Sequence, residues 1–76
     1  MKLLAKAIGR HDGRFVVLRD QGEGVAQRYV THMHWDGSNG YTEGYAWGHY
    51  FATLAEGTAD FRNRVQEEEQ ARVALV

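Results

Sequence analysis

The fold depends on residues 29–51, which read YVTHMHWDGSNGYTEGYAWGHYF. Seven of the nine aromatic residues of the chain and three of its four histidines lie in this stretch, so a binding surface is expected here. Two aromatic-rich runs flank a glycine-containing segment, a pattern that predicts a β-hairpin. The rest of the sequence reads as support for this hairpin.

The turn between the two strands decides which residues face each other. Asn39-Gly40 favours a two-residue turn, because type I′ turns require positive φ at both central positions. That turn pairs Met33 with Ala46, whereas a five-residue loop gives the other register, with Thr31 opposite Tyr45. A shift of one residue exchanges the two faces of a strand. We favour the Asn39-Gly40 register.

The two faces of this hairpin differ in chemistry. The odd positions of residues 25–35 are the more hydrophobic and are expected to face the core. In the favoured register the opposite, outward face carries Arg28, Val30, His32, His34, Tyr45, Trp47 and His49.

The rest of the chain supplies two more strands and a helix, so the fold class is α+β, a four-stranded antiparallel meander with one C-terminal helix packed on one face. Strands are predicted over residues 2–9, 14–20, 25–35 and 41–51, and a helix over residues 54–72, in a single domain spanning residues 1–76. The apolar run 15–18 indicates a central strand, and Asp12-Gly13 predicts a two-residue turn before it.

The helix has clear start signals and a narrow apolar stripe. Thr53 and Glu56 have the spacing of a capping box. The residues expected to dock on the sheet are Leu54, Thr58, Phe61 and Val65. Gly57 weakens the helix by about 1 kcal/mol relative to alanine and is expected to permit a close approach to the sheet.

Composition limits the possible functions. The chain has no cysteine, which excludes disulfides, thiolate metal sites and cysteine nucleophiles, and which fits a cytoplasmic protein. A net charge of −1 gives no reason to expect binding along a nucleic-acid backbone or to a membrane. Ser38 lies in a turn without a nucleophile elbow, and a domain this small has little room for a substrate pocket. We therefore expect no enzyme activity and no cofactor.

Two alternatives to a protein-binding module remain open. His32 and His34 share one strand face, about 7 Å apart at Cα, and His49 joins them in the favoured register to make a possible zinc site. Aromatic side chains on a sheet face also suit the stacking of single-stranded nucleic-acid bases, although the RNP pattern is absent and nucleic acid is the less favoured partner.

The leading hypothesis is a non-enzymatic macromolecule-binding module. Tyr, Trp and Arg are the residue types enriched in protein interface hot spots. The partner is expected to be a host protein, and an exposed edge strand makes either a monomer or a homodimer possible. The expected contact residues are Arg28, His32, His34, Tyr45, Trp47 and His49.

A resemblance adds to this hypothesis. The segment Trp47-Gly48-His49-Tyr50-Phe51, followed by Leu54, Gly57, Asp60-Phe61 and Arg64, resembles a pattern in small uncharacterised bacterial and phage proteins. In that pattern a strand ending in GHYF leads into an amphipathic helix with a DF pair; Gly57 departs from the better helix formers there. The match covers about the last half of the chain and implies a fold, with no catalytic role. The chain also resembles anti-CRISPR inhibitors in size and style, which suggests a phage or mobile-element inhibitor.

Overall fold

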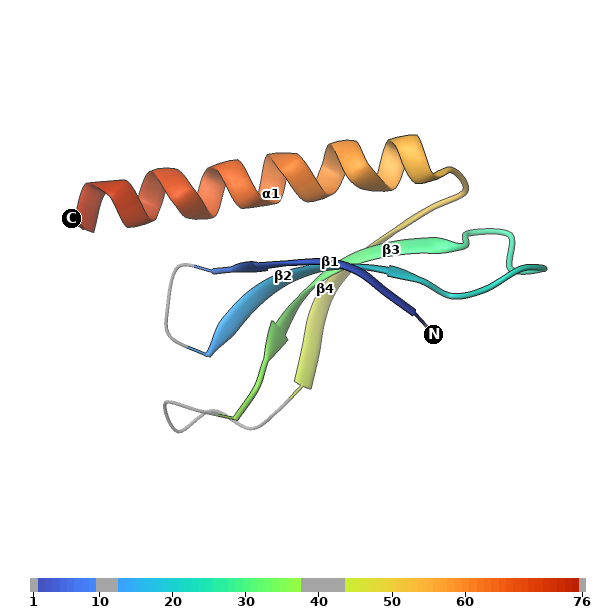
Figure 1. Ribbon diagram of the computed structural model, residues 1–76, viewed down its shortest axis with the longest axis horizontal. Coiled ribbons are helices and arrows are strands. Elements are labelled where there is room, and N and C mark those ends of the chain that lie inside the picture. Colours follow the sequence, from blue (N-terminus) through green and yellow to red (C-terminus); the bar gives the residue numbers. More distant parts are fainter. Residues whose placement is uncertain (1, 10–12, 38–43, 76) are drawn as a thin grey trace.

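The fold is a four-stranded antiparallel sheet with one helix across it. The computed structural model describes residues 2–9, 13–37 and 44–75, with side chains described as far as residue 67. The elements are β1 (Lys2–Ile8), β2 (Arg14–Asp20), β3 (Tyr29–Trp35), β4 (Gly44–Phe51) and α1 (Leu54–Leu75). The strand order is β1-β2-β3-β4, and α1 covers one side of the sheet (Figure 1), so the predicted α+β meander is confirmed. No helix in these described ranges is long and apolar enough to cross a membrane.

Most element bounds agree with the sequence to within a few residues, and β3 is the exception. It begins at Tyr29 and not at Val25. Gly22 and Gly24 both take positive φ, and the Gln21 N–H donates to the Arg28 carbonyl at 2.8 Å. The residues before Tyr29 therefore form a loop closed by this bond. β1 ends one residue earlier than predicted and α1 runs three residues further, while residues 41–43 lie outside the described ranges.

The connection between β1 and β2 differs from the prediction. A two-residue turn at Asp12-Gly13 would pair His11 with Arg14. Instead the Gly9 N–H donates to the Arg14 carbonyl at 2.6 Å, which leaves a longer connection between the strands. The two-residue turn prediction is therefore wrong, although residues 10–12 themselves lie outside the described ranges.

A β-bulge divides β4 into two halves. Met33 lies opposite Ala46, as predicted from Asn39-Gly40, a turn that itself lies outside the described residues. Beyond this point the register shifts, because Trp47 and Gly48 together lie opposite a single β3 residue. Trp47 has a φ of 56°, in the left-handed region. The register predicted from Asn39-Gly40, continued along the strand, pairs Thr31 with Gly48 and Tyr29 with Tyr50, and these two pairs are wrong.

The shift moves the second half of β4 by one residue and so exchanges its faces. Thr31 pairs with His49, and Tyr29 pairs with Phe51. His49 consequently lies on the side of the sheet that α1 covers, and not beside His32 and His34.

The core lies along the central strands. The buried apolar side chains are Val16, Val17, Leu18, Val30 and Met33. Three of them come from the apolar run of β2, which the strand order places inside the sheet, as predicted.

The helix docks through a close backbone approach at Gly57, and three of the four predicted stripe residues, Thr58, Phe61 and Val65, are half-buried. A Cβ on Gly57 would lie 3.2 Å from Leu18 Cδ1 and 3.2 Å from Tyr29 Cβ, so the expected close approach is confirmed. Leu54, the first residue of that stripe, is 48% exposed. The start signal is correct, because the Glu56 N–H donates to Thr53 Oγ1 at 3.2 Å.

Candidate binding surface

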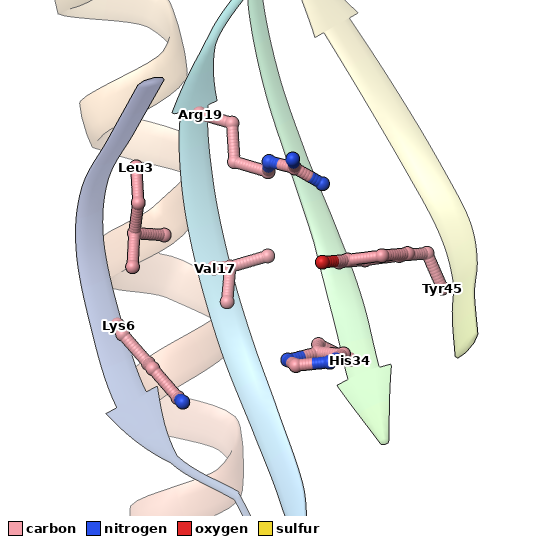
Figure 2. Close-up of a pocket in the computed structure, with 6 residues that line it drawn as sticks. All are labelled: Leu3, Lys6, Val17, Arg19, His34 and Tyr45. Atoms are coloured by element: carbon pink, nitrogen blue, oxygen red, sulfur yellow. The ribbon is translucent and has the colours of Figure 1, made fainter. Parts of the chain in front are cut away.

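One side of the sheet is not covered by the helix. Thr31 hydrogen-bonds to Asp60 of α1, so side chains at alternate positions of β3, such as His32 and His34, point to the other side. We call this side the open face, and Figure 2 shows it with α1 behind the strands. It carries Leu3, Lys6, Phe15, Val17, Arg19, His32, His34 and Tyr45.

Tyr45 is the centre of a stack of rings and a cation. Its ring lies 4.5 Å from the His34 ring, with 13° between the planes, and 4.6 Å from the His32 ring. The Arg19 guanidinium carbon lies 4.7 Å from the Tyr45 ring centroid. Tyr45 is nevertheless half exposed. The sequence-predicted residues His32, His34 and Tyr45 are therefore brought together.

A small pocket opens beside this stack. Its volume is about 110 Å³, and it is lined by Leu3, Lys6, Val17, Arg19, His34 and Tyr45 (Figure 2). The Lys6 ammonium lies 4.1 Å from the centroid of the Phe15 ring. Among the described residues, neither Lys6 nor Arg19 forms an ion pair with a carboxylate. The pocket therefore presents two positive charges.

His32 lies under the stack and is uncharged at neutral pH. It is 8% exposed, and its Nε2 has no hydrogen-bond partner among the described residues. Burial lowers the pKa of His32 to about 4, and the neighbouring charges of Arg19, His34 and Arg64 act in the same direction. His32 therefore contributes packing to the open face. The positive charge of this face comes from Lys6 and Arg19.

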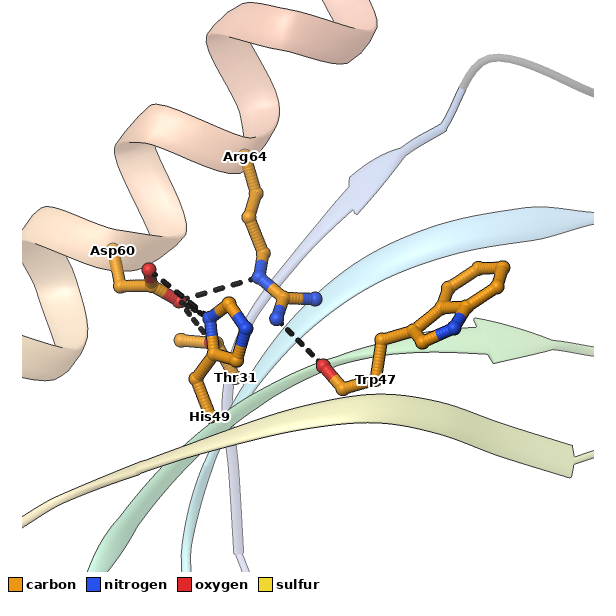
Figure 3. Close-up of polar contacts among 5 residues, drawn as sticks. All are labelled: Thr31, Trp47, His49, Asp60 and Arg64. Carbon is orange, nitrogen blue, oxygen red and sulfur yellow. Dashed lines mark hydrogen bonds and ion pairs between the residues drawn. The ribbon is translucent and has the colours of Figure 1, made fainter.

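The bulge moves two predicted site residues away from the open face. The Trp47 ring packs edge-on against Trp35 at 5.4 Å between centroids, on the helix side of the sheet. His49 Nδ1 lies 3.1 Å from Asp60 Oδ2, also on the helix side (Figure 3). The predicted grouping of Trp47 and His49 with His32 is therefore wrong.

The same geometry bears on the zinc alternative. His49 is on the opposite side of the sheet from the histidine pair of β3. Within the described ranges no three His, Cys, Asp or Glu side chains are grouped as a metal site would require. A three-histidine site is not formed by these residues.

Arg28 also lies apart from the open face. Its guanidinium makes two hydrogen bonds with the Asp20 carboxylate, at 2.6 and 2.8 Å. These bonds, with a further one from the Gly22 N–H, lower the pKa of Asp20 to about 2. Arg28 therefore holds the loop before β3 in place, and its charge is already neutralised.

Asp60 organises a polar network between α1 and the sheet. It accepts hydrogen bonds from the Thr31 hydroxyl and from Arg64 Nε, and Arg64 in turn donates to the Trp47 carbonyl at 2.6 Å (Figure 3). Burial alone would raise the pKa of Asp60, but the hydrogen bonds from Thr31 and His49 and the nearby charges lower it below its usual value. The network fixes the helix to the bulge.

Lys6 and Arg19 are the site residues that sequence reasoning missed. A signal existed, because Val17 and Arg19 are two apart on β2 and so share a face. Lys6 joins them because β1 pairs it with Val17. The two-residue turn predicted at Asp12-Gly13 also places Lys6 on this face, directly opposite Arg19, so the proximity of the two cations could have been read from the sequence.

Comparison with protein-family models, with curated proteins and with solved structures found no match to this chain. The resemblance to small bacterial and phage proteins, and to anti-CRISPR inhibitors, therefore stays a prediction.

Proposed function

We propose that the chain is a non-enzymatic binding module whose open face binds an acidic segment of a partner protein. The observation that carries this proposal is a local excess of positive charge on the open face. Lys6 and Arg19 lie on the open face, which has no carboxylate among its described residues. The described carboxylates lie elsewhere, at the end of β2, in the connections and on α1: Asp20, Glu23, Asp36, Glu56, Asp60 and Glu67.

Two cations with no described carboxylate beside them make this face locally positive, although the chain as a whole carries −1. Complementary potentials steer association and determine partner choice. Arg19 and Tyr45 are also of the residue types that dominate protein interfaces, and Tyr45 is half exposed at the centre of the face.

The arrangement of the rings favours a protein over a single-stranded nucleic acid. Bases stack on aromatic rings whose faces are free. Here the Tyr45 ring lies between Arg19 and His34, and the Phe15 ring is covered by Lys6. A base would have to displace these contacts to stack on either ring. Two cations also neutralise too few phosphates to bind a nucleic-acid backbone tightly.

A small inhibitor carried by a phage or mobile element is the concrete form of this proposal, and its support is the sequence resemblance. Such an inhibitor would act by occupying an acidic surface of a host protein.

Affinity capture from the host, with a matched pair of charge reversals, tests the proposal. Arg19→Glu is compared with Arg62→Glu, which makes the same change at an exposed position of α1. The partner is identified by mass spectrometry and its affinity is then measured with purified protein. We expect Arg62→Glu to retain binding and Arg19→Glu to abolish it, with Tyr45→Ala costing about 2 kcal/mol or more. Equal binding by both charge reversals would contradict a role for the open face.

A further inference from the structure

We infer that the pocket between Lys6, Arg19 and Tyr45 is a binding site for one oxyanion group, a carboxylate or a phosphoryl group. The inference rests on the proposed function, because the oxyanion is the group of the partner that enters the open face. The inference says where on the open face the partner is bound, and which chemical group of the partner is bound there.

The size of the pocket fits a small group and excludes a large ligand. Pockets for drug-sized ligands and cofactors measure about 300–1,000 Å³. The pocket here measures about 110 Å³. A water molecule occupies about 30 Å³ of the liquid, so the pocket has room for roughly four non-hydrogen atoms, close to the size of a carboxylate or phosphate group.

Donors reach the pocket from three strands. Lys6 comes from β1, Arg19 from β2 and Tyr45 from β4, and Figure 2 shows the Tyr45 hydroxyl between Arg19 and His34. A guanidinium binds carboxylate and phosphate in a bidentate manner, and an ammonium and a phenol add single donors. These are the groups that oxyanion recognition requires.

The two cations are already held in place. Arg19 lies over the Tyr45 ring, and Lys6 lies over the Phe15 ring. Side chains fixed before binding lose less conformational entropy when the ligand arrives, which raises affinity. Val17, 2% exposed, forms an apolar wall of the pocket, and apolar surroundings strengthen the attraction between a cation and an oxyanion.

The test is a titration of the ¹⁵N-labelled full chain with sodium phosphate and, separately, sodium acetate at pH 7, followed by two-dimensional NMR. Sodium chloride at matched ionic strength is the reference. We expect saturable shifts at the backbone amides of the pocket residues Leu3, Lys6, Val17, Arg19 and Tyr45. A phosphate affinity at least about tenfold higher would assign the site to phosphoryl groups, an acetate affinity higher by the same factor would assign it to carboxylates, and equal affinities would assign it to oxyanions of either kind.

Two conservative substitutions locate the site. Arg19→Gln is expected to raise the dissociation constant for the anion about tenfold, because a hydrogen bond to a charged group is lost. Arg62→Gln, which makes the same change on α1, is expected to leave it unchanged. Tyr45→Phe keeps the ring under Arg19 and removes only the hydroxyl, so a smaller increase is expected. The spectra of the variants without anion confirm that each chain is folded.

Shifts that do not saturate, that chloride reproduces, or that Arg62→Gln weakens equally would overturn the inference. The two proposals fail separately. A partner lost on Arg19→Glu, with no saturable anion binding, refutes only the oxyanion pocket. Saturable anion binding, with partner capture insensitive to Arg19→Glu, refutes only the binding module.

Discussion

The Arg64 guanidinium donates a 2.6 Å hydrogen bond to the main-chain carbonyl of Trp47, and this contact joins α1 directly to the bulge of β4. The Nε of the same guanidinium donates to Asp60 Oδ2 at 3.2 Å. The docking of α1 and the bulge of β4 are therefore held by the same two side chains, Asp60 and Arg64. Substitutions in this set separate the energetic roles of the bulge, the network and the helix.

The backbone at the bulge is expected to prefer glycine to alanine. Trp47 has a φ of 56°, a conformation that costs an L-residue about 1–2 kcal/mol. Trp47→Gly and Trp47→Ala both lose the ring contact with Trp35, so their difference reports the backbone alone. We expect the glycine variant to be more stable by about 1 kcal/mol in urea unfolding, followed by Trp35 fluorescence.

The matched control lies one residue earlier in the same strand. Ala46 pairs regularly with Met33, so Ala46→Gly is expected to destabilise the chain by about 0.5–1 kcal/mol, the opposite sign. If glycine lowers stability at both positions, Trp47 does not hold the left-handed conformation in solution.

Removal of the Asp60 carboxylate is expected to lower the stability of the protein more than a substitution at an exposed helix position does. The Thr31 hydroxyl is fully buried and donates to Asp60, so Asp60→Ala leaves a buried donor without its partner. We expect a loss of about 2–3 kcal/mol in the free energy of unfolding. Glu67→Ala, at an exposed position of the same helix, is expected to change it by less than about 0.5 kcal/mol.

A second substitution checks the mechanism of that loss. Thr31→Val removes the hydroxyl, so adding it to Asp60→Ala is expected to cost less than the sum of the two single changes. Additive losses would show that the two side chains do not interact in the folded state.

Gly57→Ala is expected to destabilise the protein although alanine is the better helix former. The added Cβ would lie 3.2 Å from Tyr29 Cβ, which is fixed to the backbone, and 3.2 Å from Cδ1 of the buried Leu18. The helix gains up to about 1 kcal/mol in propensity, and overpacking costs about 1–3 kcal/mol. Thermal unfolding should therefore show a lower midpoint, and a higher one would mean that α1 lies further from the sheet.

Stability is expected to fall as the pH drops from about 6.5 to about 4. The pKa of His32 is about 4 in the folded chain, against 6.5 for an unperturbed histidine, so in this window the unfolded chain binds a proton that the folded chain does not. The loss from this group is on the order of 3 kcal/mol at most, and it is absent above pH 6.5. Urea unfolding over this range measures it.

His32→Phe keeps a ring against Tyr45 and removes the titrating group, so its stability should depend less on pH in the same window. The Asp60 carboxylate acts at lower pH, because its pKa lies below 3.8 in the folded chain and its stabilising effect is lost as the pH falls through that lower value. An NMR titration in which the His32 ring protonates near pH 6.5 would contradict both its burial and this prediction.

Most features that local sequence signals predict are correct in the structure, with the exceptions of the Asp12-Gly13 turn and the start of β3. Strand alternation, the central apolar run of β2, the cap at Thr53 and the close approach at Gly57 each depend on a few neighbouring residues. The pairing of Met33 with Ala46 was likewise predicted from the turn that favours it.

The predicted faces of the second half of β4 are wrong because of a single extra residue. A bulge adds one residue to a strand without disturbing its composition, and Gly48 was the only local hint of one. Everything after Trp47 changed face as a result, including His49. The cations Lys6 and Arg19 share a face in both the predicted and the observed pairing of β1 with β2, and they were missed because the expected site was confined to residues 28–49.

The bulge also bears on self-association, because β4 is an edge strand of the sheet. A regular edge offers a continuous row of backbone donors and acceptors to any passing strand. Here the row is divided into residues 44–46 and residues 49–51, with Trp47 in a left-handed conformation between them. An incoming strand of regular geometry can therefore pair with only one short half at a time. The bulge that sets the faces of β4 therefore also disfavours edge-to-edge pairing of this strand with other molecules.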